Sequence, residues 1–103
     1  MTIANPLRGE ANLLVGGERL LLRPSFEALV AAEDELGSLF LLVERASAGE
    51  LTLRQIATLF DHLSRERSAA ITRERIGEAI VETGLAKLTP TLRTILAQVL
   101  QGR

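Results

Sequence analysis

The chain of 103 residues contains no cysteine, tryptophan or tyrosine. The missing cysteines exclude disulfide bonds, thiolate zinc sites and thiol nucleophiles, and their absence fits a reducing compartment such as the cytoplasm. Only three residues are aromatic, all of them phenylalanine, so a hydrophobic core has to be built from Leu, Ile, Val and Ala side chains. This composition favours packing between helices, and we expect a mostly helical protein.

The chain also lacks a large net charge and a long apolar run. It has 12 Lys and Arg against 13 Asp and Glu, a formal net charge of −1, which provides no overall field to attract nucleic acid or an anionic membrane. No stretch approaches the roughly 18 apolar residues of a membrane-spanning helix. Asn5, Pro6, Arg8 and Glu10 lie where a signal peptide needs an apolar segment. We therefore expect a cytoplasmic protein that neither crosses nor binds a membrane.

No pattern in the sequence indicates catalysis. The single histidine, His62, directly follows Asp61, and neighbouring residues on a helix point about 100° apart, so the two side chains do not converge as a catalytic pair. The carboxylate run at residues 33–35 lacks the further oxygen ligands that a metal ion needs, and the glycines form no phosphate-binding loop. We expect no catalytic, cofactor-binding or metal-binding residues, and no enzymatic activity.

Residues 10–23 have the pattern of a β-hairpin. Gly16 and Gly17 can supply the positive φ values of a tight two-residue turn between two apolar-rich arms. Successive side chains of a strand point to opposite faces of the hairpin. One face is apolar and should meet the helices, and the other is mostly polar but also carries Leu14 and Leu21. We expect this pair of leucines to mediate self-association. The residues of the inner face are Ala11, Leu13, Val15, Leu20 and Leu22.

Helix start and stop signals predict five short helices after the hairpin. The clearest start is at Thr52, because Thr52 and Gln55 match a capping box. The last helix is expected to begin with Thr89 as its cap and Pro90 in its first turn. The sequence thus predicts one domain over residues 1–103 of the α+β class, mostly α, with an N-terminal two-stranded hairpin packed on about five helices. The predicted helices cover about residues 25–36, 38–47, 52–66, 72–84 and 89–101.

Apolar residues at helical spacing predict which side of each helix faces the core. Glu33 falls beside the stripe of the first helix, and we expect it to be partly buried with an Arg. The stripe of the last helix has more apolar positions than one neighbour would cover, so we expect this helix to take part in self-association together with the outer hairpin strip. We also expect Leu96 and Leu100 to be exposed and to contact a partner. The predicted stripes are, in chain order, Phe26, Leu29, Val30 and Leu36; Leu39, Leu42, Val43 and Ala46; Leu53, Ile56, Ala57, Leu59, Phe60 and Leu63; Ile76, Ala79 and Ile80; and Leu92, Ile95, Leu96, Val99 and Leu100.

The charge distribution leaves a nucleic-acid-binding alternative open. Residues 1–51 carry four basic and eight acidic side chains, a net −4, whereas residues 52–103 carry eight basic and five acidic side chains, a net +3. Two helices joined by a short linker and flanked by arginines invite comparison with a helix-turn-helix. The linker at residues 67–71 is long for that motif, and nearby glutamates dilute the positive charge. The arginines concerned are Arg65, Arg67, Arg73 and Arg75.

Several segments together resemble a known family of short proteins from gene transfer agents and related tailed phages. The similarity spans roughly residues 4–100, and the first half is the more specific. Members of this family are known as phage tail tube proteins of the gene transfer agent type or as tail assembly chaperones. The segments that carry the resemblance are Ala4-Asn5-Pro6-Leu7-Arg8-Gly9-Glu10, the Gly16-Gly17 hairpin, Phe26-x-x-Leu29, Glu33-x-x-x-Gly37-Ser38-Leu39 and Leu53-x-x-x-x-x-Leu59.

The resemblance implies a role in building a phage-like tail. Tail assembly chaperones bind the tape measure protein, a long helical chain that sets tail length, and keep it soluble until tail tube subunits polymerise around it. The tape measure protein is therefore the first expected partner, with the tail tube protein as a second candidate. A tube subunit should be dominated by β-structure, and only residues 10–23 are predicted as strand, which favours a chaperone. The alternatives are a small structural tail component and, in another class, a helical nucleic-acid-binding regulator.

Overall fold

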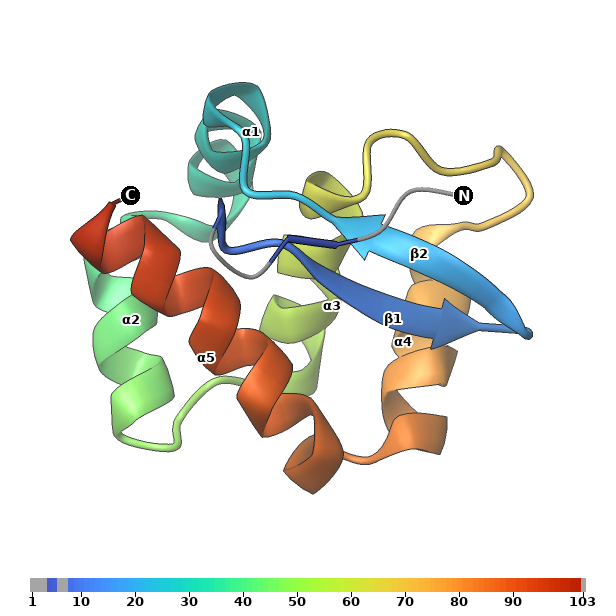
Figure 1. The fold of residues 1–103 in the computed structure, drawn as a ribbon. Coiled ribbons are helices and arrows are strands. Elements are labelled where there is room, and N and C mark those ends of the chain that lie inside the picture. Colours follow the sequence, from blue (N-terminus) through green and yellow to red (C-terminus); the bar gives the residue numbers. More distant parts are fainter. Residues whose placement is uncertain (1–3, 6–7, 103) are drawn as a thin grey trace.

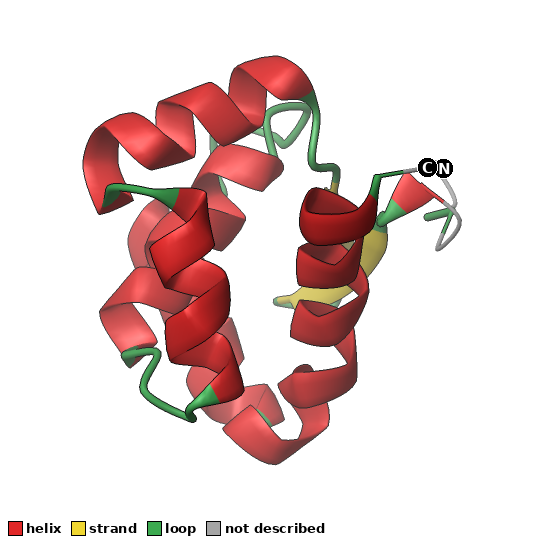
Figure 2. Ribbon diagram, turned by 90° about the vertical axis from the view of Figure 1, so that its left-hand side faces the viewer, coloured by secondary structure: helices red, strands yellow, loops and turns green. Residues whose placement is uncertain are grey.

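The computed structural model describes residues 4–5 and 8–102, and its elements follow the predicted order, a hairpin and then five helices (Figure 1). The predicted α+β fold, mostly α, is confirmed. Figure 2 shows the hairpin behind the helix that ends at the C-terminus. In the described part of the chain, no helix combines the length and the apolar character needed to span a bilayer. The elements are β1 (Ala11–Val15), β2 (Glu18–Leu22), α1 (Phe26–Leu36), α2 (Leu39–Ser47), α3 (Leu53–Leu63), α4 (Arg73–Thr83) and α5 (Leu85–Gln101).

The hairpin forms with the predicted two-residue turn and the predicted division into two faces. Gly16 and Gly17 have φ values of +56° and +84°, which residues with a side chain rarely adopt. The two strands pair antiparallel with Leu13 opposite Leu20. Because side chains alternate between the faces of a strand, this register turns one apolar face toward α3, α4 and α5. That face is buried as predicted, through Leu13, Val15, Leu20 and Leu22, with Ala11 partly buried beside them.

Side-chain caps start three of the helices where the sequence predicts them. Ser25 Oγ accepts a hydrogen bond from the backbone of α1, and Thr72 Oγ1 does the same for α4. At α3 the capping box is complete: Thr52 Oγ1 accepts from Gln55 N at 3.1 Å, and Gln55 Oε1 accepts from Thr52 N at 2.9 Å. These bonds satisfy backbone N–H groups that a helix leaves without internal partners.

α2 begins where the sequence predicts it, but without the usual side-chain cap. Ser38 occupies the cap position, and its side chain makes no capping hydrogen bond. Instead the Glu33 carboxylate accepts from Leu39 N at 3.1 Å, placing a negative charge where the helix dipole favours one. The expectation that Glu33 is partly buried with an Arg is therefore wrong. Its side chain is exposed, and it joins the end of α1 to the beginning of α2.

α1 faces the core with small side chains rather than with its largest ones. Ala28 and Ala32 are completely buried, whereas Phe26 is 81% exposed and Val30 is 40% exposed. The prediction of Phe26 and Val30 as core residues is therefore wrong. α1 packs closely against α3, and a methyl side chain allows two helix backbones to approach where a benzyl group would hold them apart. The members of the predicted stripe that do pack against the core are Leu29 and Leu36.

α3 is the central helix, and its predicted stripe is buried apart from Leu53, which is 41% exposed. Thr58 is buried although the sequence did not predict it. The helix ends at Leu63 rather than near residue 66. Ser64 Oγ donates to Phe60 O at 2.7 Å, and the Arg67 guanidinium donates to backbone carbonyls of the last turn. These groups satisfy the C-terminal carbonyls, so that the chain can leave the helix there.

α5 begins at Leu85 rather than at Thr89, so Pro90 lies inside the helix and not in its first turn. Proline lacks the N–H that would bond to the carbonyl of the preceding turn, which costs the helix one hydrogen bond. The earlier start buries Leu88, which is 2% exposed, and this burial offsets the loss. Gly84, at φ +91°, both ends α4 and precedes α5, so the two helices follow each other without a linker.

Candidate partner-binding surfaces

A groove of about 580 Å³ runs along α5 on the side of α2. Its α5 wall repeats at helical spacing through Leu85, Leu92, Leu96 and Leu100, which puts these leucines on one stripe along the helix. Across from this stripe stand residues of α2, and the loop and first turns of α3 contribute Leu51 and Ile56. We call this feature the α2–α5 groove. The residues that α2 contributes are Val43, Ala46 and Ser47.

The two leucines predicted as contact residues occupy different depths of the α2–α5 groove. Leu96 is only 7% exposed, so the expectation that it is exposed is wrong. It is covered because the middle of α5 packs between α2 and the hairpin. Leu100, one turn closer to the C-terminus, is 54% exposed, as expected. A partner would therefore meet Leu100 directly, while Leu96 supports the floor of the groove.

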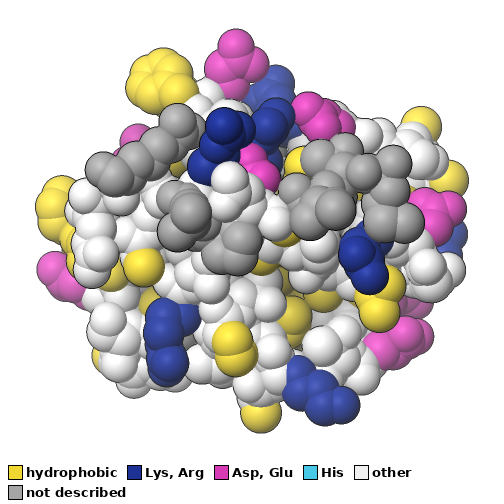
Figure 3. Space-filling model, viewed as in Figure 1, with side chains coloured by type: hydrophobic (Ala, Val, Ile, Leu, Met, Phe, Trp, Pro, Cys, Tyr) yellow, Lys and Arg dark blue, Asp and Glu magenta, His cyan; other side chains and the backbone are white. Residues whose placement is uncertain are grey.

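One charged side chain lines the α2–α5 groove in the described part of the chain, the exposed Arg93. None of the described carboxylates pairs with it. Figure 3, drawn in the orientation that has α5 in front, shows separate hydrophobic side chains among Lys and Arg, with Asp and Glu mainly toward the margins. The groove is thus a mostly apolar surface with three uncharged polar residues, Ser47, Thr89 and Gln101, and a single positive group.

The outer face of the hairpin is a less continuous surface than the sequence suggests. Leu14 is 61% exposed and lies opposite Arg19. Leu21 is half-buried, because it lines two small hollows together with Glu66 in the loop after α3. The two leucines share the predicted face, but only Leu14 projects freely from it. The self-association assigned to this strip stays a prediction.

A turn before the hairpin lies against α5 at Gln98, which is not among the residues that line the groove. Glu10 N donates to Asn5 O at 3.0 Å, and the Glu10 carboxylate accepts from Asn5 N at 3.0 Å and from Arg23 Nε at 3.1 Å. Burial opposes ionisation of this carboxyl group, but the bonds from Arg23 and Asn5 prevail and lower the pKa of Glu10. Gly9, at φ +73°, lies so close to Gln98 of α5 that a Cβ atom would overlap that side chain.

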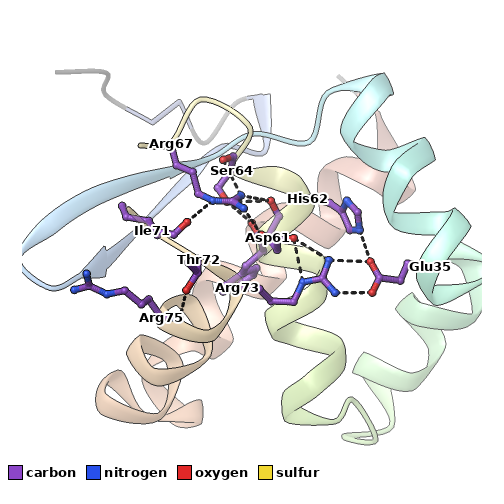
Figure 4. Close-up of polar contacts among 10 residues, drawn as sticks. Glu35, Asp61, His62, Ser64, Arg67, Ile71, Thr72, Arg73 and Arg75 are labelled. Atoms are coloured by element: carbon purple, nitrogen blue, oxygen red, sulfur yellow. Dashed lines mark hydrogen bonds and ion pairs between the residues drawn. The ribbon is translucent and has the colours of Figure 1, made fainter. Parts of the chain in front are cut away.

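A cluster of ionic side chains joins α1, α3 and α4 (Figure 4). Both oxygens of Glu35 accept hydrogen bonds from the Arg73 guanidinium, which also donates to Asp61 Oδ2 at 2.8 Å. His62 Nε2 lies 2.7 Å from Glu35 Oε1, and Arg67 pairs with Asp61. As predicted, His62 and Asp61 do not pair with each other. Hydrogen bonds from Arg73, and then from His62, lower the pKa of Glu35 to about 2.

This ionic cluster weakens the case for nucleic-acid binding. Of the four arginines near the junction between α3 and α4, Arg67 and Arg73 are held by carboxylates. The pKa of Arg73 is raised above its ordinary value chiefly by Glu35 and then by Asp61. These ion pairs offset positive charge that would otherwise attract phosphates. The cluster therefore acts as a connection among three helices.

The lowered pKa of Glu35 predicts a loss of stability in acid. The pKa of about 2 lies below the ordinary value of 4.5, so as the pH falls from about 4.5 toward 2 the unfolded chain takes up a proton that the folded chain does not. The contribution of Glu35 to the free energy of unfolding is complete above about pH 4.5, and it shrinks as the pH falls toward 2. We expect the difference in unfolding free energy between the wild type and Glu35→Gln to decrease accordingly in urea titrations. A difference that stays constant from pH 6 to pH 3 would contradict this assignment.

Comparison with known proteins links the chain to one family. A family model described as "Phage tail tube protein, GTA-gp10" matches residues 8–102. The match covers the hairpin and all five helices of the described structure. Neither the curated proteins nor the solved structures contain a match.

Proposed function

The chain belongs to the family of phage tail tube proteins of the GTA-gp10 type, and on this premise we propose that it is a tail assembly chaperone of a gene transfer agent or prophage. In this role it binds the tape measure protein in the bacterial cytoplasm and keeps it soluble until the tube is built around it. The role consists of protein binding and includes no catalytic step.

The α2–α5 groove is the observation that carries this proposal. A tape measure protein is a long helical chain, and amphipathic helices are commonly bound by laying their apolar side into a hydrophobic groove. α5 has 17 residues, which at about 1.5 Å per residue corresponds to roughly 25 Å of helix length. That length matches several turns of a client helix. The exposed Leu100 lies at one end of this surface, where it can contact the client.

A small structural component of the tail is the second candidate, and the family description favours it directly. Tube subunits are expected to form stacked rings through extended β-structure. The described residues contain one hairpin of two five-residue strands, which is little material for such a ring. Of the two candidates, the chaperone is therefore better supported than the structural component. In either role the chain would also bind the tail tube protein.

Co-expression with the tape measure protein of the same gene cluster tests the proposal. We expect the client to be soluble with the wild type and to lose most of its solubility with Leu100→Ser, because the substitution removes an apolar contact from the groove. The matched control is Val81→Ser on α4, which alters a side chain of similar exposure, 63% against 54%. Both variants should melt like the wild type, since neither side chain is buried.

Two results would decide against the chaperone. One is a tape measure protein that is equally soluble without this chain. The other is recovery of this chain from purified particles at a fixed copy number, which would establish the structural component in its place.

A further inference from the structure

Arg93 occupies the centre of the α2–α5 groove. It is the middle residue of the 17 in α5 and lies beside the stripe of Leu92, Leu96 and Leu100. Its neighbours on the groove wall are uncharged, and apart from Thr89 they are apolar. The described carboxylates that form ion pairs are bound to other cations. An apolar surface with one central positive group is complementary to an apolar surface with one negative group.

The same position argues against a second copy of this chain as the occupant. In a two-fold pairing that buries the whole stripe, the two α5 helices run either parallel or antiparallel, and in both arrangements the middle residue of one meets its counterpart. Arg93 of one copy would face Arg93 of the other, and like charges brought together in an interface oppose association. The exposed leucines alone would permit this dimer, but the central arginine disfavours it.

We propose that the α2–α5 groove binds an amphipathic helix whose apolar stripe is interrupted by one Asp or Glu, and that this carboxylate pairs with Arg93. The inference rests on the proposed function, because it specifies the segment of the tape measure protein that the groove selects. The leucines provide most of the affinity, and Arg93 fixes the register and direction of the client helix. Binding then depends only weakly on salt, since a single ion pair is involved.

The test uses the full chain and overlapping synthetic peptides that cover the tape measure protein of the same gene cluster. Binding is measured by fluorescence anisotropy, and circular dichroism reports whether the bound peptide becomes helical. We expect Arg93→Glu to weaken the best peptide about tenfold or more, whereas Arg93→Lys keeps the charge and most of the affinity. The matched control is Lys87→Glu, which makes the same charge reversal at an exposed position of α5 outside the groove.

A charge swap identifies the partner residue. Replacing the Asp or Glu of the bound peptide with Lys should weaken its binding to the wild type and restore its binding to Arg93→Glu. Equal losses for Arg93→Glu and Lys87→Glu, or no rescue by any swapped peptide, overturn the inference.

The outcome also separates this inference from the proposed function. Full-length tape measure protein that binds the wild type and Arg93→Glu equally well leaves the chaperone role standing and overturns the inference alone. If the wild type binds neither the protein nor any peptide, both fail. Sedimentation adds a further check, because a wild-type dimer that Leu100→Ser converts to a monomer would show that a second copy occupies the groove.

Discussion

Replacing Phe60 with Ala is expected to destabilise the protein by about 3–5 kcal/mol. Phe60 is the largest of the completely buried side chains and lies on the central helix α3. Truncation removes most of its apolar surface from the core, and the surrounding side chains can only partly collapse into the cavity. Since domains of this size have a total stability of roughly 5–15 kcal/mol, the variant should be partly unfolded under conditions in which the wild type is not.

Urea unfolding followed by circular dichroism measures this effect. Leu53→Ala on the same helix is the control, because the sequence predicts Leu53 in the same stripe whereas the structure leaves it 41% exposed. Its loss should stay below about 1 kcal/mol. Similar urea midpoints for both variants would mean that Phe60 is not in the core.

Replacing Gly9 with Ala should have the second-largest effect, about 2–5 kcal/mol, from two causes. The residue has φ +73°, a conformation that costs a residue with a Cβ atom about 1–2 kcal/mol. The added methyl group would also overlap Gln98 of α5, and such overpacking typically costs a further 1–3 kcal/mol. The overlap would push the turn before the hairpin away from α5.

Gly49→Ala separates these two causes. Gly49 has φ +72°, close to that of Gly9, but an added Cβ atom would meet no atom within 4 Å. This variant should show the conformational cost alone. If both substitutions lower the thermal midpoint equally, the contact between Gly9 and α5 contributes nothing. A larger shift for Gly9→Ala, with faster hydrogen exchange in α5, would establish that the turn holds this helix in place.

Local signals in the sequence were sufficient to predict the order and type of the elements. The turn at Gly16 and Gly17 and the capping box at Thr52 depend on residues close together in the chain, so they can be recognised without knowledge of the tertiary structure. Other features depend on contacts between distant residues. The position at which α5 begins is one such feature. The preference of proline for the first turn of a helix favours a start near Pro90, whereas the burial of Leu88 favours an earlier start. Only the packed structure reveals that Leu88 is buried.

The rotation of α1 about its axis explains the remaining errors near that helix. Apolar spacing favours a core-facing side through Phe26, but the close packing on α3 turns Ala28 and Ala32 inward. Glu35 lies on that same side of the helix, three residues after Ala32, and so reaches Arg73 and His62. The sequence contained the carboxylate and the cations, but it could not show which glutamate of the run at residues 33–35 would meet them.

For the proposed partner-binding surface, the sequence indicated the helix along which the groove lies but not how deeply each leucine is buried. The wide stripe of α5 predicted an unpartnered side, and the α2–α5 groove lies along it. Leu96 is buried and Leu100 is exposed because α2 and the hairpin pack against the middle of α5, and these contacts join elements that lie far apart in the sequence. The role proposed for Arg93 likewise rests on its position in the groove, which no local pattern in the sequence reveals.

The tight packing of α1 on α3 also constrains how this family can diverge. Ala28 and Ala32 are completely buried at that contact, so any larger residue there would separate the helices, and we expect descendants of this sequence to keep Ala, Gly or Ser at both positions. Phe26 and Val30 are exposed, so packing against α3 does not restrict the size of the side chain at either position. The outer side of α1 can therefore acquire new binding preferences over evolutionary time while the inner side remains unchanged.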